Sequence, residues 1–138
     1  MSASDQAIVR FLLDNRELDF PLLLKHGNNE WGFGLKTGVT FIQGQIDLWC
    51  ELENEIHVLD YKTGSSEYSE KAFEQLSFYT HALAGMKVIS ESKKIIHSVV
   101  YPIEQVVKKK EFKDLKSFRA QCDPRVLEIF KEQAPAPA

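Results

Sequence analysis

The stretch from Ile56 to Gly64, Ile-His-Val-Leu-Asp-Tyr-Lys-Thr-Gly, constrains the fold of this chain most. It begins with apolar and β-branched residues, as a buried strand does, and ends in a Thr-Gly turn signal. Side chains alternate faces along a strand, so Asp60 and Lys62 share one face and Tyr61 points to the other. A carboxylate and an ammonium group side by side at the end of an apolar strand predict a functional site.

The preceding stretch, Phe41–Cys50, also has the pattern of a strand. The polar link Glu51–Glu55 joins the two, which predicts an antiparallel hairpin. A turn centred on Glu53-Asn54 places Asp47 directly opposite Asp60, with their Cβ atoms roughly 5 Å apart on the face of the lysine. A slip of one residue would move Asp47 to the other face of the sheet.

Like charges that face each other destabilise a hairpin, and a divalent cation between them removes this cost. Hard oxygen ligands at this spacing suit Mg²⁺, which takes one or two carboxylates together with substrate phosphate. A nearby lysine can contact the phosphate or orient an attacking water. These groups are the parts needed for metal-assisted phosphodiester hydrolysis. The competing interpretation is an ordinary salt bridge on the surface of a hairpin.

Three motifs follow one another in the order Gly44-x-Ile46-Asp47, Val58–Gly64 and Gln75-x-x-x-Tyr79. This ordered set resembles the PD-(D/E)XK nucleases, and most closely the RecB-like nuclease domain at the C-terminus of AddA- and RecB-type helicase–nucleases. Upstream, Arg16–Phe20 resembles the strand that opens this domain in that branch. The resemblance extends from about Arg16 to about Phe112.

The resemblance implies a Mg²⁺-dependent deoxyribonuclease, exonuclease rather than endonuclease, in which Mn²⁺ substitutes for Mg²⁺. It implies DNA as substrate, a role in repair or recombination, and a helicase region in the same polypeptide or in a partner subunit. It also implies roles for six residues: catalysis by Asp47, Asp60 and Lys62, metal binding by Asp47, Asp60 and the carbonyl of Tyr61, and DNA binding by Gln75 and Tyr79. An ordinary amphipathic helix face is the alternative for the last two.

One feature departs from the RecB-like pattern. That branch usually adds a metal-ligating histidine or acid from a helix before the first strand, but here no histidine precedes His26. We therefore expect either a C-terminal piece of a longer chain or a variant without this ligand. A catalytically silent module, which binds DNA or docks on a helicase, is the alternative function.

The 138 residues suffice for one domain, which we expect over residues 1–133, followed by a flexible, proline-containing tail over 134–138. The net charge of −3 means that any DNA contact must depend on local patches. Two cysteines, Cys50 and Cys122, cannot hold an iron–sulfur cluster and indicate reduced thiols in a cytoplasmic protein. No apolar run is long enough to cross a membrane.

The remaining patterns complete an α+β order with a mixed sheet flanked by helices, as in the restriction-endonuclease-like core. We expect helices over Asp5–Asn15 (capped by Ser4), Ser69–Ala84 and Asp114–Gln121, and a last one from Asp123-Pro124. We expect strands over Leu18–Leu24, Trp31–Gly34, Ile95–Tyr101 and Gln105–Lys110, with a turn at Gly27-Asn28-Asn29. Trp49 shares the face of Asp47, and we expect it and Trp31 to pack in the core, with base stacking as the alternative. We expect the histidines to be structural residues and not metal ligands.

Overall fold

A five-stranded mixed sheet forms the centre of the computed structural model, which describes residues 2–38 and 40–131. The strands follow the order β1-β2-β3-β4-β5, with β3 and β4 parallel and the other neighbours antiparallel. Their bounds are β1 (Asn28–Thr37), β2 (Thr40–Glu51), β3 (Glu55–Tyr61), β4 (Lys94–Tyr101) and β5 (Val106–Phe112). The sequence prediction of an α+β fold with a mixed sheet is confirmed.

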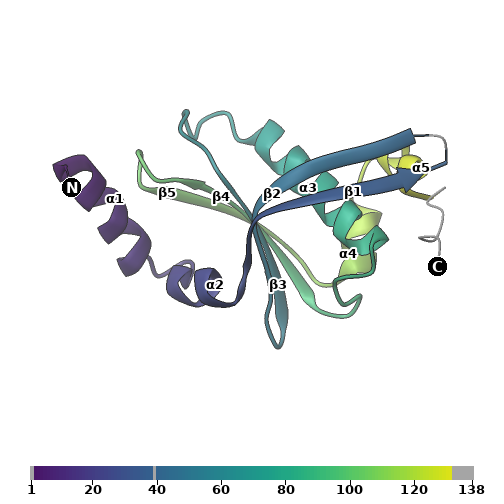
Figure 1. Ribbon diagram of the computed structural model, residues 1–138, viewed down its shortest axis with the longest axis horizontal. Coiled ribbons are helices and arrows are strands. Elements are labelled where there is room, and N and C mark those ends of the chain that lie inside the picture. Colours follow the sequence, from purple (N-terminus) through teal and green to yellow (C-terminus); the bar gives the residue numbers. More distant parts are fainter. Residues whose placement is uncertain (1, 39, 132–138) are drawn as a thin grey trace.

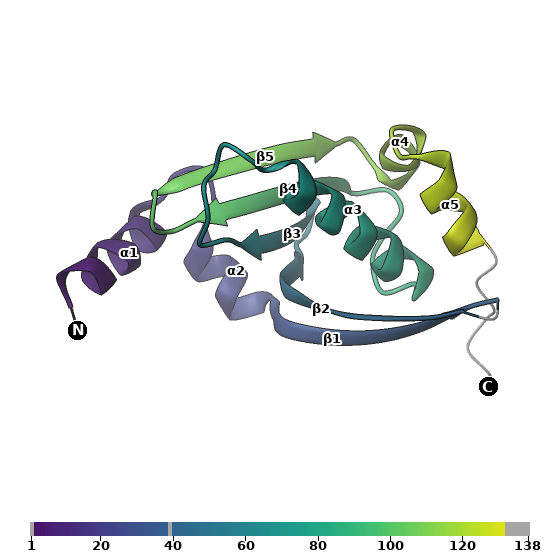
Figure 2. The ribbon, with the colours of Figure 1, turned by 90° about the horizontal axis from the view of Figure 1, so that it is seen from above.

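Helices cover both faces of this sheet (Figures 1 and 2). They are α1 (Ala3–Asp14), α2 (Phe20–His26), α3 (Glu70–Gly85), α4 (Leu115–Ala120) and α5 (Pro124–Lys131). The long helix α3 connects the parallel strands β3 and β4, as such a crossover requires. Across the parts of the chain that the structure describes, no helix combines the length and hydrophobicity needed to span a bilayer.

Two apolar cores lie on opposite faces of the sheet. The larger core packs beneath α3, and its fully buried side chains include Ile56, Val58 and Leu76. The smaller core packs beneath α2 and includes Leu48 and Leu59. Consecutive residues of β3 thus enter different cores, which is the alternation expected of a central strand buried on both faces.

The β2–β3 hairpin has the register predicted from the sequence. Leu48 pairs with Leu59 and Glu51 with Ile56, and the Leu52 amide donates to the Glu55 carbonyl at 2.8 Å. Extending this register by one pair places Asp47 level with Asp60, as predicted. The ladder itself ends at Leu48, and beyond it β2 leaves β3 and runs with β1 as a long curved ribbon (Figure 2).

The divergence of β2 from β3 coincides with a change of face. Ile46 lies in the core beneath α3, whereas Leu48 lies in the core beneath α2, although residues two apart in a regular strand share a face. Opposite this point in β1, Glu30 has a positive φ of 46°. The irregularity therefore falls at Asp47, where the two strands separate and leave room at the sheet surface.

The prediction of a strand over Leu18–Leu24, and with it an opening strand at Arg16–Phe20, was wrong. This segment forms the helix α2. The Asp19 side chain caps it by accepting from the Leu22 amide at 3.2 Å, and Pro21 occupies the first turn, where a missing amide costs nothing. The apolar run fits a period of two, but Phe20 and Leu23, which are both buried, are three residues apart and fit a helix instead.

The predictions for the next segment were partly wrong. Gly27 ends α2, and the residues predicted to continue a turn, Asn28 and Asn29, already pair with β2. The short strand expected over Trp31–Gly34 is part of a ten-residue strand, because pairing with β2 stabilises a glycine-containing segment of low strand propensity. At the N-terminus, Ser2 rather than Ser4 caps α1, since its hydroxyl accepts from the Asp5 amide.

The later elements occur where the sequence placed them. The helices α3 and α4 and the strands β4 and β5 match the expected segments within about two residues at each end, and α5 begins at the predicted Pro124. The Asp114 carboxylate caps α4 by accepting from the Ser117 amide at 2.8 Å, as expected. Trp49 is 8% exposed and packs edge-on against Trp31, so its predicted core role is confirmed. The predicted tail over 134–138 lies outside the described residues.

Candidate active site

Two carboxylates meet where β2 separates from β3. An Asp47 Oδ2 atom accepts a hydrogen bond from the Tyr61 amide at 2.8 Å, which ties the end of one strand to the other. The Asp60 side chain is buried beside it, with only 4% of the residue exposed. Lys62 places its Nζ atom 2.8 Å from Asp60 Oδ2. The structure thus brings together the two acids and the lysine that the sequence predicted to share a face.

The charges of these residues act on one another. Burial raises the pKa of Asp60 to about 6, the Lys62 ammonium opposes this rise, and the neighbouring Asp47 carboxylate adds to it. The pKa of Lys62 is raised, chiefly by its contact with Asp60. Near neutral pH the site therefore contains a carboxylate that is costly to ionise and a lysine that stays protonated.

A chain of hydrogen bonds extends from the lysine to α3. Lys62 Nζ donates to Gln75 Oε1 at 3.2 Å, and Gln75 Nε2 donates to the Tyr79 hydroxyl at 2.7 Å. Gln75 and Tyr79 are one helical turn apart and so lie on the same side of α3. Both residues predicted to face the site therefore do so. The Tyr79 ring is 8% exposed and also packs edge-on against Phe33, so it contributes to the core as well.

The glycine of the first motif makes room for this packing. A Cβ atom on Gly44 would lie 3.0 Å from the Phe33 ring and 3.5 Å from the Tyr79 ring. The first distance is below ordinary van der Waals contact, so any side chain at this position would press on the ring that supports Tyr79. Gly44 thus serves the arrangement of α3 against β2.

The two carboxylates fit a hard divalent cation by their chemistry. Asp60 Oδ2 is buried, and the Lys62 ammonium lies 2.8 Å from it as an ion-pair partner. One ammonium group faces two neighbouring carboxylates, so a divalent cation between Asp47 and Asp60 would offset the repulsion that Lys62 leaves. Within residues 2–38 and 40–131 no cluster of three or more His, Cys, Asp or Glu side chains forms a metal site. The oxygen donors available are therefore the two carboxylates and nearby backbone.

The histidines lie away from this cluster. His26 is exposed at the end of α2, on the helix that the sequence analysis mistook for a strand. His57, His81 and His97 are buried, as their expected structural roles require. His57 Nε2 pairs with Glu55 Oε1 at 2.8 Å.

A pocket that the sequence analysis missed adjoins Lys62. It has a volume of about 300 Å³ and lies between the loop after β3, the start of α3 and the end of β4. Its lining includes Tyr68, Lys71 and Tyr101. Tyr68 closely follows β3, the strand that carries the second motif, but nothing in the sequence pattern showed that the intervening loop folds back beside the lysine.

The mixed sheet, its crossover helix and the acid pair at the strand ends are features of nuclease domains with a restriction-endonuclease-like fold. Comparison with protein families agrees: residues 5–136 match the family described as the PD-(D/E)XK nuclease superfamily, and the chain belongs to this superfamily. Its members are generally nucleases and typically use divalent metals. DNA is the substrate class associated with this superfamily.

Other comparisons add little. No curated protein matches the chain. Among solved structures, the one titled "Crystal structure of SSO0001" is 12% identical over 80% of this chain, with a TM-score of 0.38. The chain covers 52% of that structure, about half of its length.

Proposed function

We propose that this chain is a metal-dependent DNA nuclease domain of the RecB-like branch, which hydrolyses phosphodiester bonds as an exonuclease in DNA repair or recombination. The support is the order of the three motifs and the site in which their residues meet. We further propose that residues 1–133 form a single nuclease domain and that it acts with a helicase, in the same polypeptide or as a partner subunit.

The meeting of Asp47, Asp60 and Lys62 at the point where β2 leaves β3 carries this proposal. Asp47 and Asp60, together with the Tyr61 carbonyl, are the groups that would hold Mg²⁺, with Mn²⁺ as a substitute. In such sites the cation lowers the pKa of a bound water and offsets charge on the phosphate. The Asp47 carboxylate is oriented for this task by the Tyr61 amide.

Lys62 acts as a fixed positive charge. Its raised pKa keeps it protonated near neutral pH, so it donates hydrogen bonds and does not serve as a general base. Asp60 and Gln75 hold its Nζ atom from two sides, at 2.8 and 3.2 Å. This placement suits contact with the scissile phosphate or orientation of the attacking water. Gln75 and Tyr79 contribute polar groups on the DNA side of the same site.

The test is cleavage of labelled single-stranded and duplex DNA with Mg²⁺, with Mn²⁺ and with EDTA. Either metal should support cleavage and EDTA should abolish it. Asp60→Ala should lower the rate by a factor of roughly a hundred or more, because the metal is lost with the carboxylate. Asp14→Ala, which changes an exposed acid of α1, is the matched control and should cleave normally. Equal activity of Asp60→Ala and wild type would refute the assignment, and DNA binding without cleavage would favour the silent module.

A further inference from the structure

The pocket beside Lys62 has the composition of a nucleotide site. Its charged lining residues are Lys62 and Lys71, and no carboxylate lines it in the described part of the chain. The Tyr101 ring, 2% exposed, contributes an apolar wall. The Tyr68 ring at the rim is 77% exposed, the highest exposure among the large hydrophobic side chains of the described residues that lie at the surface. An exposed aromatic ring next to two lysines is a combination suited to a base and its phosphates.

The loop that carries Tyr68 is held in place from a distant hairpin. The Ser66 amide donates to Glu104 Oε2 at 2.9 Å, and the Ser66 carbonyl accepts from Lys108 Nζ. Glu104 and Lys108 belong to the β4–β5 hairpin, about forty residues further along the chain. Ser66 lies within a turn from Ser65 to Tyr68, in which the Tyr68 amide is 3.5 Å from the Ser65 carbonyl. Both backbone polar groups of Ser66 are thus anchored, which fixes the wall of the pocket.

We propose that this pocket binds one unpaired nucleotide of a DNA strand, adjacent to the scissile phosphate, with Tyr68 stacking on the base and Lys71 contacting a phosphate. The inference rests on the proposed function, because Lys62 is shared between the pocket and the candidate active site. It assigns Tyr68 and Lys71 as specificity-determining residues and a single strand as the favoured substrate.

Two properties of the pocket favour an unpaired nucleotide over duplex DNA. A ring stacks on a base only when that base is free of its neighbours, as at a strand end or in a single strand. The volume of about 300 Å³ also lies at the lower limit of ligand pockets, which suits one nucleotide better than a base pair. Stacking tolerates any base, so the site predicts strand selectivity without sequence selectivity.

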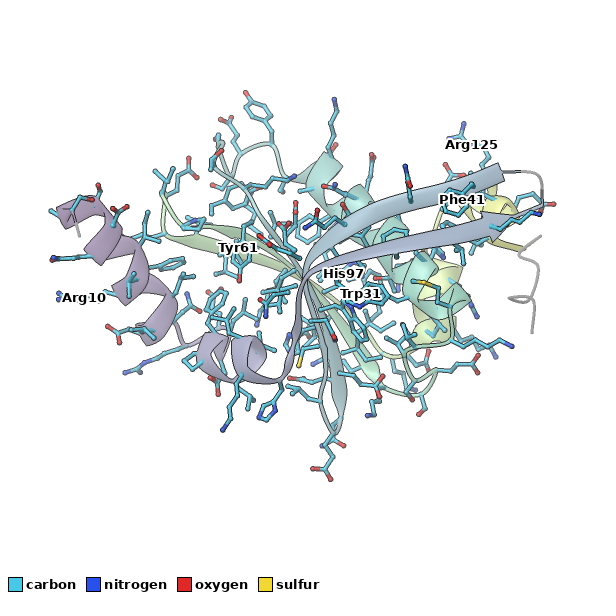
Figure 3. All side chains as sticks on the ribbon, in the orientation of Figure 1. Arg10, Trp31, Phe41, Tyr61, His97 and Arg125 are labelled. Carbon is cyan, nitrogen blue, oxygen red and sulfur yellow. The ribbon has the colours of Figure 1, made fainter. Side chains whose placement is uncertain are left out.

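The first test measures DNA binding in EDTA, where metal-dependent cleavage does not consume the probe. Fluorescence anisotropy with a labelled oligothymidylate and with a duplex of the same length gives both affinities. Tyr68→Ala should weaken single-strand binding roughly tenfold or more and leave duplex binding nearly unchanged. Tyr68→Phe keeps the ring and should bind as wild type does. Phe41→Ala is the matched control, because Phe41 is another exposed aromatic residue, 64% exposed and far along the β1–β2 ribbon from Tyr61 (Figure 3).

The second test concerns Lys71. In Lys71→Ala the slope of log K against log salt concentration should decrease in magnitude by about 0.7, the value for one phosphate contact to a single strand. Lys25→Ala, which removes an exposed lysine of α2 on the other side of the sheet, should leave this slope unchanged. Thermal melts check that each variant is folded, and the exposure of both side chains makes unfolding unexpected.

The outcomes separate this inference from the proposed function. Wild-type protein that does not prefer the single strand, or Tyr68→Ala and Lys71→Ala proteins that bind it as wild type does, would overturn the nucleotide site even if DNA is cleaved. Weaker single-strand binding by both variants would support the site even if wild-type protein fails to cleave with Mg²⁺. In that second case the nuclease assignment alone would fall.

Discussion

At the scale of single residues, Asp47 and Asp60 show a site that trades stability for chemistry. Asp60 is buried with a pKa raised to about 6, against about 4 for the unfolded chain. Protonated Asp60 therefore contributes to the free energy of unfolding. This contribution is fully present below pH 4 and is lost as the pH rises through 6. At neutral pH the ionised Asp60 therefore faces the Asp47 carboxylate at a cost in stability, which a cation between the two would reduce.

The first residue-scale prediction concerns Asp47→Asn, which removes one charge and keeps the shape. The amide oxygen can still accept from the Tyr61 amide. In EDTA this variant should melt no lower than wild type, with a gain on the order of 1 kcal/mol from relief of cross-strand repulsion. Mg²⁺ should raise the melting temperature of wild type and raise that of the variant much less. Thermal melts in EDTA and in excess Mg²⁺ test this, and a clearly less stable variant in EDTA would identify Asp47 as a structural residue.

The second residue-scale prediction concerns Lys62→Ala, which should retain metal binding and lose cleavage. A protonated lysine has no lone pair to offer a metal. Its loss removes the cation that opposes the rise in the pKa of Asp60, so the calorimetric metal titration compares the two proteins at several pH values from neutral upward. A nuclease assay under the same conditions completes the comparison. Loss of metal binding by a folded Lys62→Ala protein would contradict the proposed division of roles.

At the scale of elements, the sequence predicted the β2–β3 hairpin and its register because a short polar link and buried alternation leave few pairings. It did not predict α2, because a short apolar run such as Leu22–Leu24 fits either period and the cap at Asp19 decides between them. It predicted too short a strand at β1, because the glycines of this segment have low strand propensity and pairing with β2 stabilises the strand. The pocket wall escaped prediction because its anchors, Glu104 and Lys108, are distant in sequence.

The element-scale prediction tests those anchors. Glu104→Ala removes the acceptor of the Ser66 amide at the exposed tip of the β4–β5 hairpin. Hydrogen bonds from Ser66 lower the pKa of Glu104, because they favour its charged form. Amide hydrogen exchange should therefore speed up at Ser66 and its neighbours while the rest of the chain keeps its protection. Glu53→Ala, at the tip of the β2–β3 hairpin, is the control, and unchanged exchange at Ser66 in Glu104→Ala would show that the loop is held by other contacts.

At the scale of the whole molecule, the core beneath α3 contains two buried histidines as well as apolar side chains. His97 is fully buried, and its Nε2 atom lies 2.6 Å from the Thr80 hydroxyl. His81 is 3% exposed and packs against the rings of Phe118 and Phe130. Burial lowers the pKa of His81 to about 4 and that of His97 to about 3. We therefore expect both residues to be neutral in the folded core, so that acid weakens the packing of α3 against β4.

The whole-molecule prediction is that acid weakens the fold through these histidines, in a window set by their pKa values. An unfolded histidine takes up a proton near pH 6.5, but folded His81 does so only near pH 4. The stability that neutral His81 contributes is thus present above pH 6.5 and is lost as the pH falls toward 4.

His81→Phe keeps an aromatic ring against Phe118 and Phe130 and removes the titrating group. When the pH is lowered from 7.5 to 4.5, the variant should therefore lose about 2 kcal/mol less of its free energy of unfolding than wild type does. Urea unfolding of both proteins at the two pH values, in EDTA, measures this difference. Asp60 titrates in the same window with the opposite sign, but it is present in both proteins and cancels in the comparison. An equal loss of stability in the two proteins would show that His81 is protonated within the folded state or is accessible to water.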